Sequence, residues 1–202
     1  MKVRSDMPSA ANSSNFNAMP NAATGKTTTL DNLKAAVQGE TGASAKYAIF
    51  AEAAEDQGFK QIAKLFRCAS AAEQVHIKLE VAEIKKKEPD YVAPSAPEAT
   101  AANTDINLID GANGEIFETS DMYPTFIAVA QEEGEKSAET VFTRAKLAES
   151  VHAERYLEAY NNIDAPDDDD FYLCPVCGYI HKGTDFEKCP ICFAPKNIFQ
   201  KF

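Results

Sequence analysis

Two Glu-x-x-His motifs constrain this chain more than any other feature of its sequence. Ala72-Glu73-Gln-Val-His76 recurs later as Ala148-Glu149-Ser-Val-His152. Residues three apart share one face of a helix, so the Glu and His of each motif point the same way. A Gly-Glu pair precedes each motif, at Gly39-Glu40 and Gly114-Glu115, and its Glu lies 33 or 34 residues before the Glu of the motif. The repetition indicates one helical hairpin written twice.

The four-helix pattern predicts a metal site inside the bundle. Two helices that each give Glu, with two that each give Glu-x-x-His, are the ligand pattern of ferritin-like bundles with two carboxylate-bridged metal ions. Glu118 follows Glu115 by three and adds a fifth carboxylate to the same face. A single Glu-x-x-His motif would be explained by a Glu at the surface and a His whose nitrogens have ordinary hydrogen-bond partners. Glutamates at matched depth on four apolar helices, however, are costly to bury without a partner.

The fold class expected is an all-α four-helix ferritin-like bundle with one long crossover, followed by a small C-terminal metal-knuckle domain. Thr29 or Asp31 can cap the first helix, and Gly58 and Gly134 mark turns. Pro124 removes a backbone hydrogen bond and should bend the third helix near Tyr123. The four expected helices cover about 29–57, 59–87, 105–133 and 135–162.

The connection between the second and third helices contains Pro89, Pro94 and Pro97 and is too long for a tight turn. Extended at ~3.3 Å per residue, about 17 residues reach ~55 Å, whereas a helix of ~28 residues is ~42 Å long. The connection can therefore run the full length of the bundle. The same reach would let the second hairpin pack on the first hairpin of another chain, so domain exchange is a second possibility.

Charge and apolar content exclude two classes of partner. The net charge is -11 and no basic face is visible, which argues against nucleic acid. No run of about 18 apolar residues is present, so we expect no membrane span. Residues 1–27 lack periodicity and an apolar signal core, which predicts a disordered tail in a cytoplasmic protein, with an organelle transit peptide as the alternative.

Two Cys-x-x-Cys pairs lie near the end of the chain. Cys174 and Cys177 are separated from Cys189 and Cys192 by eleven residues, which is a strong tetrathiolate signal in a reducing compartment. Residues 164–170 form an acidic linker, and the tail 171–202 has too little core to fold without the metal. Zinc is favoured for such knuckles in isolation. Beside a di-metal bundle, iron is the better choice because it can pass single electrons.

Two tyrosines share the ligand faces. Tyr47 follows Glu40 by seven residues, and Tyr123 follows Glu115 by eight. Either hydroxyl could hydrogen-bond a carboxylate that ligates the metal. A core aromatic residue is an equally good interpretation of either spacing. The spacing alone leaves both open.

The two parts together resemble rubrerythrin, a ferritin-like di-iron bundle followed by a rubredoxin-like domain. The resemblance covers about residues 28–202, so that the expected units are a di-iron domain at 28–163 and a rubredoxin-like domain at 171–202. The residues that carry it are Gly39-Glu40 with Tyr47, Glu73-x-x-His76, Glu115-x-x-Glu118 with Met122-Tyr123-Pro124, Glu149-x-x-His152, and Cys177-Gly-Tyr-x-His181.

The resemblance implies a role for each ligand. Glu73 and Glu149 would bridge two non-haem irons. Glu40 would bind one iron, with His76 and Glu118 as ligands that exchange on it. Glu115 and His152 would bind the other iron. A single electron-transfer iron would be held by Cys174, Cys177, Cys189 and Cys192, and zinc is a possible substitute for it.

The activity implied is the reduction of hydrogen peroxide to water. Electrons would come from an NAD(P)H-dependent reductase, directly or through a separate rubredoxin, and the protein would be a homodimer, with domain swapping or higher assembly as alternatives. A ferroxidase that sequesters iron is the competing function, although storage needs no electron input from a tail domain. A zinc-knuckle protein with a purely structural bundle is the third.

Overall fold

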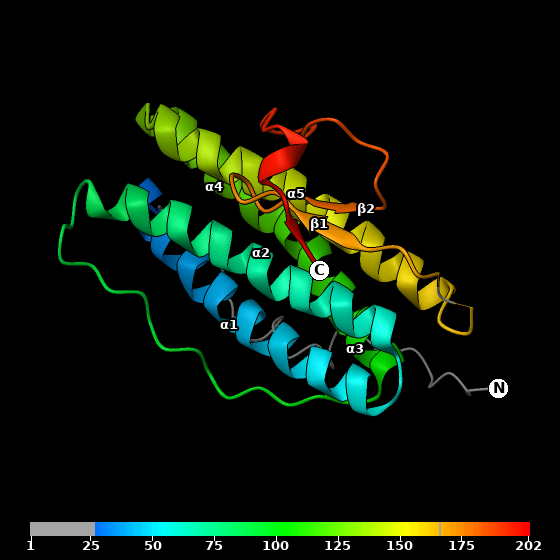
Figure 1. The fold of residues 1–202 in the computed structure, drawn as a ribbon. Helices are drawn as coiled ribbons and strands as arrows, with labels where there is room; N and C mark the ends of the chain where they lie inside the picture. The colour runs from blue at the N-terminus through cyan, green and yellow to red at the C-terminus, as the bar shows by residue number, and fades with distance from the viewer. Residues whose placement is uncertain (1–26, 166) are drawn as a thin grey trace.

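The computed structural model describes residues 27–165 and 167–202, so the tail expected at 1–27 lies almost wholly outside the described residues. Four rods form the bundle and a small sheet follows it (Figure 1). No helix in these residues is long and apolar enough to cross a membrane. The rods are α1 (Thr29–Asp56), α2 (Lys60–Lys85), the third rod α3 (Thr104–Phe117), η2 (Glu118–Met122) and α4 (Tyr123–Glu133), and α5 (Lys136–Asn161).

The first helix is capped one residue earlier than expected. Thr28, and neither Thr29 nor Asp31, is the N-cap, and its hydroxyl accepts from the Asp31 backbone N–H at 3.1 Å. In return, the Asp31 carboxylate, at the third helical position, accepts a hydrogen bond from the Thr28 backbone N–H at 3.0 Å. This capping box satisfies two donors that a helix start leaves unpaired. At the other end Gly58 takes a φ of 82°, which turns the chain into α2.

The third rod is interrupted by a π-helical turn rather than simply bent at Tyr123. Pro124 has no N–H, so the regular bond to the carbonyl four residues earlier cannot form. The disturbance spreads upstream, and η2 widens the helix from Glu118 to Met122 before α4 resumes at Tyr123. A π turn shifts the angular position of the residues after it. Here the π turn lies between Glu115 and Tyr123, so it changes the direction of the Tyr123 side chain relative to that of Glu115.

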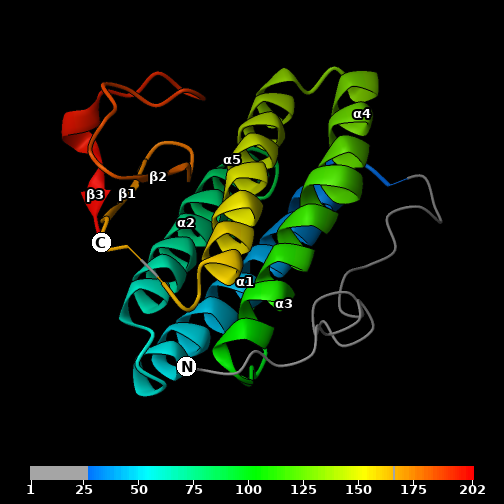
Figure 2. The same ribbon diagram turned by 90° about the vertical axis from the view of Figure 1, so that its right-hand side faces the viewer.

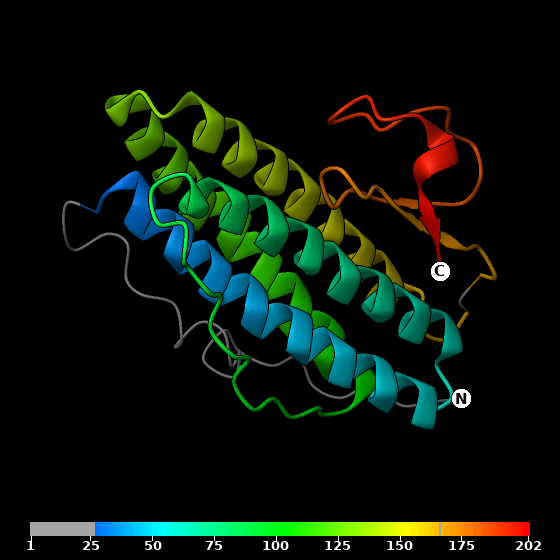
Figure 3. The same cartoon turned by 60° about the vertical axis from the view of Figure 1, so that its left-hand side comes forward.

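The long connection runs beside the bundle. In Figure 3 residues 86–103 leave the end of α2 and pass along α1 before α3 begins at the other end. Within this single chain, the helices of the second hairpin pack against those of the first. Gly42 on α1 faces the connection, where an added Cβ would lie 3.6 Å from Pro97.

A polar layer divides the core of the bundle. One apolar cluster lies on the α1–α2 turn side and includes Tyr47, Phe66 and Tyr156. The other lies toward the α4–α5 turn and includes Phe126 and Phe142. The buried carboxylates and imidazoles occupy the chain positions between these clusters. Apolar packing on both sides of the layer fixes its side chains in place.

The C-terminal unit rests on the bundle (Figure 2). Its sheet has the order β2-β1-β3, with β1 (Phe171–Leu173) antiparallel to β2 (Ile180–Lys182) and to β3 (Gln200–Lys201). A short 3-10 helix, η3 (Lys196–Ile198), precedes β3. Strand residues belong to the same apolar cluster as α1 and α2, and Lys182 bonds Glu158 of α5 at 2.6 Å. The unit is therefore packed against α2 and α5.

Candidate metal centres

The polar layer contains two overlapping groups of ligand atoms. Within each group, one atom from every residue lies within 4.8 Å of all the others. Both groups share Glu73 and Glu149, and every member is buried. Two metal ions that share two carboxylates would need this overlap. The groups are Glu40, Glu73, His76 and Glu149, and Glu73, Glu115, Glu149 and His152.

Several ligand atoms lie close together without forming hydrogen bonds to one another. The two Glu149 oxygens each lie 2.6 Å from an imidazole nitrogen, Nδ1 of His76 and Nδ1 of His152, without the geometry of a hydrogen bond. Buried polar atoms in proteins almost always have partners, so these unpartnered atoms are suited to bind a cation. The other carboxylate oxygens in the two groups without a partner are Glu40 Oε2, Glu73 Oε1 and Glu115 Oε2. The residues present therefore fit a pair of metal ions.

Backbone carbonyls fix the tautomers of both histidines. His76 Nε2 lies 3.1 Å from the carbonyl oxygen of Cys177, and His152 Nε2 lies 2.9 Å from that of Gly178. A carbonyl only accepts, so each Nε2 carries the hydrogen. In the neutral imidazole Nδ1 then presents a lone pair to the carboxylate groups, as a metal ligand must.

Each tyrosine singled out from the sequence contacts a carboxylate on another rod. The Tyr47 hydroxyl of α1 donates to Glu115 Oε1 of α3 at 2.6 Å. The Tyr123 hydroxyl of α4 donates to Glu40 Oε1 of α1. The second oxygen of each glutamate is thereby left for the metal groups. Both tyrosines are buried.

Glu118 is buried at 2% exposure but belongs to neither group. It begins the π turn η2, one turn beyond Glu115. His76, by contrast, is within reach of the Glu40 group. Of the two residues expected to exchange on one iron, the structure thus places His76 with the other ligands and leaves Glu118 beside them.

Burial and mutual repulsion hold protons in this layer. Burial and the nearby Glu149 raise the pKa of Glu40 to about 7 and that of Glu115 to about 8. Burial alone would lower the pKa of His76, but Glu149 and other carboxylates outweigh it and raise the pKa to about 10. The opposite balance applies to Glu149, whose pKa the two imidazoles lower despite burial. Metal binding must displace these protons.

The metal-free protein should lose stability as pH rises. Glu40, Glu115 and His76 have raised pKa values, so the folded state binds more protons than the unfolded state. The carboxyl contribution is complete below about pH 4.5 and is lost through about pH 7 and 8; that of His76 is complete below about pH 6.5 and lost toward pH 10. The Tm of chelator-treated protein should therefore fall from about pH 5 to about pH 10.

The metal-loaded protein is the control for that titration. Its ligands are deprotonated by the metal, so its Tm should stay level or rise with pH between about 5 and 8. Differential scanning calorimetry at matched ionic strength compares the two forms. A metal-free protein whose Tm rises across this interval would contradict the proton assignment.

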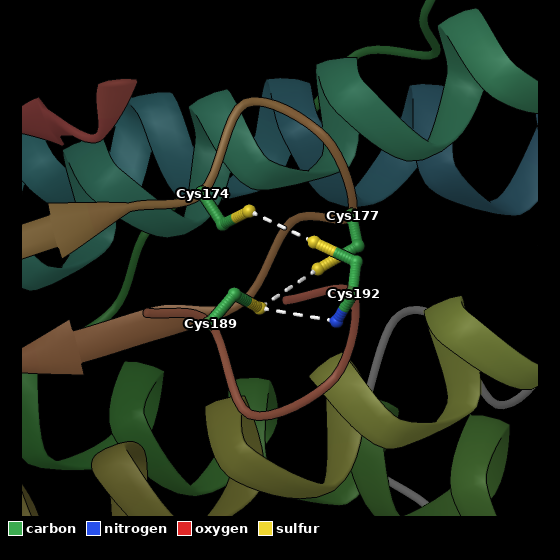
Figure 4. Close-up of side chains that lie close together, drawn as sticks. All are labelled: Cys174, Cys177, Cys189 and Cys192. Atoms are coloured by element: carbon green, nitrogen blue, oxygen red, sulfur yellow. Dashed lines mark hydrogen bonds between the residues drawn. The ribbon is translucent and has the colours of Figure 1, made fainter. Parts of the chain in front are cut away.

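The four knuckle cysteines face one another in Figure 4. Cys174 and Cys192 have sulfurs 3.5 Å apart, as do Cys177 and Cys189, and all four lie within 4.8 Å. A disulfide would need about 2.05 Å, so these are free thiols. Hydrogen bonds from Cys174 and Cys177 lower the pKa of Cys189. Four sulfurs at this spacing form a tetrahedral cage for iron or zinc.

The two knuckles have the same backbone geometry. Cys174 N–H donates to the Tyr179 carbonyl at 2.8 Å, and Cys189 N–H donates to the Ala194 carbonyl at 2.8 Å. The residue after the second cysteine has a left-handed φ in both, 79° at Gly178 and 62° at Phe193. Only the first of these positions requires glycine, because a Cβ added at Gly178 would overlap His76 Nε2.

Sequence reasoning missed two buried features of the site. Glu80 of α2 is completely buried and contacts the Tyr123 hydroxyl at 3.0 Å. Its signal was available, since it follows His76 by four and lies on the same helix face. The second feature is the ion pair of Lys46 and Asp110, 2.7 Å long, which ties α1 to α3 beside Tyr47.

Fold and site together define a helical-bundle protein with the donor set of a di-iron carboxylate centre, joined to a rubredoxin-like unit with four cysteine ligands. The comparisons give the family. The Rubrerythrin family model matches residues 31–160, and that of the rubrerythrin rubredoxin-like domain matches residues 172–200. This chain belongs to the rubrerythrin family.

Named relatives agree with the family along the whole chain. Nigerythrin of Nitratidesulfovibrio vulgaris is 61% identical over 202 residues, covering 100% of both chains. Rubrerythrin-2 of Clostridium acetobutylicum is 33% identical and covers 86% of this chain and 96% of that one. The rubrerythrin of Nitratidesulfovibrio vulgaris is 34% identical, with 84% and 91% covered.

Solved structures show the same fold. Fully reduced, all-ferrous nigerythrin superposes with a TM-score of 0.87 at 61% identity and covers 100% of both chains. Symerythrin from Cyanophora paradoxa, reduced with dithionite, has a TM-score of 0.62 at 18% identity, and the match covers 82% of this chain and 100% of that one. The second likeness concerns the fold alone. The predicted ferritin-like bundle with a rubredoxin-like unit is thus confirmed.

Proposed function

We propose that this protein is a rubrerythrin-type peroxidase that reduces hydrogen peroxide to water at the bundle site, with electrons delivered through the four-cysteine cage. The observation that carries the proposal is the contact between the two sites. His76 and His152 each use one ring nitrogen on the knuckle backbone and turn the other toward the carboxylate groups. A metal pair and an electron carrier would therefore share two imidazole bridges.

The residue roles that fit this arrangement follow the ligand groups. Glu73 and Glu149 belong to both groups and would bridge. Glu40 would serve one metal ion, while Glu115 and His152 would serve the other. His76 and Glu118 would be the exchanging ligands on the Glu40 side. Tyr47 and Tyr123 would hold Glu115 and Glu40 by their hydroxyls.

Peroxide reduction consumes two electrons and two protons and yields two waters. These ligands would hold an iron pair, which would supply the two electrons when bound. The protein residues keep the site closed, since every ligand in the two groups is buried and apolar clusters cover it on two sides. Glu149 keeps its charge because the two imidazoles lower its pKa.

Electrons would return one at a time from the cage. Cys177 is both a cage cysteine and the residue whose carbonyl accepts from His76. Gly178, its neighbour, accepts from His152. The path from the Cys177 sulfur to the bundle therefore consists of covalent bonds within Cys177 and Gly178 and one hydrogen bond to an imidazole. A redox-inert zinc in the cage would leave this path without a use, which supports iron there.

The remaining parts of the proposal concern the cell and the assembly. An NAD(P)H-dependent reductase, acting directly or through a separate rubredoxin, would reload the cage. The protein would act in the cytoplasm against oxidative stress and would form a homodimer. Domain exchange between chains is an alternative arrangement that the long connection permits by its length.

The test is an anaerobic reaction of the reduced protein with peroxide. We expect about three irons per chain, two in the bundle and one in the cage. Hydrogen peroxide should reoxidise both sites rapidly, with about one peroxide consumed per two electrons, and no iron mineral should form. Slow reoxidation by peroxide beside fast ferrous oxidation by dioxygen would overturn the proposal in favour of a ferroxidase. Zinc alone in both sites would favour a structural protein.

A further inference from the structure

Glu80 is a buried carboxyl that neither metal group uses. It lies on α2 one turn beyond His76 and has no exposed surface. Its Oε1 atom is 3.0 Å from the Tyr123 hydroxyl, and that hydroxyl also contacts Glu40 Oε1. Tyr123 of α4 therefore sits between a carboxylate of the metal group on α1 and a carboxyl outside it on α2.

Glu80, Tyr123 and Glu40 form a triad, and a count of its hydrogens indicates which carboxyl is protonated. Two oxygen–oxygen contacts meet at the Tyr123 hydroxyl, but a phenol carries one hydrogen. The second contact needs a hydrogen from one of the carboxyls. Both glutamates have an Oε2 atom without a partner, but only Glu40 belongs to a ligand group and must be a carboxylate to bind a cation. The geometry alone allows the Tyr123 hydroxyl to donate to either carboxyl. With a cation on Glu40, a hydrogen for each contact requires one on Glu80, which then donates to Tyr123, which donates to Glu40.

We propose that Glu80 is a positioning residue of the bundle site: as a neutral acid it holds the Tyr123 hydroxyl on Glu40 Oε1 and so directs Glu40 Oε2 to the metal. The triad spans three rods, α2, α4 and α1, and sets the direction of the hydroxyl hydrogen. A carboxylate ligand fixed in this way binds through one predetermined oxygen. The inference requires a metal in the bundle but does not depend on peroxide as substrate.

The charges around Glu80 agree with a neutral acid. Two divalent cations carry four positive charges, and the two groups contain four carboxylates that balance them. In that count, a charge on Glu80 or on the nearby buried Glu118 has no cation to balance it. The groups facing Glu80 are Glu40 from α1, His76 from its own helix, Tyr123 from α4 and Glu149 from α5. Burial, with the charge of Glu40, raises the pKa of Glu80.

The other side of the site is built differently. Tyr47 donates to Glu115, and the Tyr47 ring is packed against aromatic rings, with Tyr156 at 5.4 Å and Phe66 at 6.3 Å between centroids. Tyr123 also packs against aromatic rings, with Phe142 at 6.0 Å and Phe126 at 6.3 Å between centroids, but its hydroxyl has the Glu80 carboxyl as a second contact. The two metal positions therefore differ in how their terminal glutamate is oriented.

The first measurement tests the proton on Glu80. Infrared spectra of the metal-loaded protein at neutral pH should show the C=O stretch of a protonated carboxylic acid, and Glu80→Gln should reduce this absorption by one group. Glu118 is also buried, so Glu118→Gln is recorded beside it. Absence of the band, or an undiminished band in Glu80→Gln, would overturn the proposal. No turnover is involved, so the result is independent of whether peroxide is reduced.

The second measurement tests positioning, with Co²⁺ as the probe. Glu80→Gln keeps a neutral donor to Tyr123, so the variant should bind two Co²⁺ in the bundle with wild-type affinity and absorption. Glu80→Leu removes the donor and should weaken one of the two Co²⁺ by about 10-fold, the scale of losing a group that orients a ligand. Tyr123→Phe should show the same loss, and the double variant should show little more.

These outcomes separate positioning from other roles. If Glu80→Gln weakens Co²⁺ as much as Glu80→Leu, the anion itself is required and Glu80 is a ligand, which overturns the proposal. If Glu80→Leu binds both ions as the wild type does, Glu80 positions nothing. Should Glu80→Leu not fold, the infrared band and the Glu80→Gln titration still decide the proposal.

Discussion

Replacing Glu149 by glutamine should leave the bundle unable to hold its metal pair and should abolish peroxide reduction. Each Glu149 oxygen lies 2.6 Å from a different imidazole nitrogen, and the residue belongs to both ligand groups. Glutamine replaces one of these oxygens with an amide NH2, which has no lone pair for a cation. Loss of a group that only orients a ligand costs about 10–100-fold, so loss of the bridging ligand that we propose should exceed about 100-fold in activity.

Metal analysis and anaerobic kinetics check this expectation. Iron should fall from about three to about one per chain, because the cage lies outside the substitution. The visible absorption of the cage iron should therefore persist in Glu149→Gln. Glu154→Gln is the matched control, since Glu154 is exposed on the same helix and its charge change is the same. Wild-type iron content and peroxide reduction in Glu149→Gln would refute the bridging role.

The bundle could be predicted from the sequence because its signals are local. Helix breakers at Gly58, Gly134 and the proline-rich connection separate the rods, and the repeated Glu-x-x-His fixes which faces point inward. The cage could be predicted for the same reason, because each pair of cysteines is only three residues apart. Caps and the interruption of the third rod were less predictable. The π turn arises from how one rod accommodates Pro124 inside a packed core.

Glu80 shows where sequence reasoning ends. Its position four residues after His76 indicates the right helix face, but Glu83 follows His76 by seven, near the same face, and bonds Lys86 and Ser137 at the surface. Burial of Glu80 depends on Tyr123, 43 residues away. The contact of His76 with the Cys177 carbonyl spans 101 residues. Such pairings arise only when separate rods and the C-terminal unit are packed together.

Substitution of Gly178 by alanine should uncouple the cage from the bundle. An added Cβ would overlap His76 Nε2, far inside van der Waals contact, and the collision involves a buried imidazole with no room to move. The knuckle would have to shift away, and the bonds of the Cys177 and Gly178 carbonyls to His76 and His152 would be lost. Displacement by about 1 Å can cost about 100-fold in rate.

Stopped-flow spectroscopy resolves this effect from a general loss of stability. After anaerobic reduction and mixing with peroxide, the cage iron of Gly178→Ala should reoxidise about 100-fold more slowly than in the wild type, while the cage keeps its absorption. Gly183→Ala is the matched control. Its φ of 82° imposes the same backbone strain, about 1–2 kcal/mol, but the nearest atom to its added Cβ is Asp185 Oδ1 at 3.7 Å. Both variants should lose Tm, and only Gly178→Ala should slow electron transfer. Equal slowing in both would mean that strain in the knuckle domain, and not the contact with His76, controls the rate.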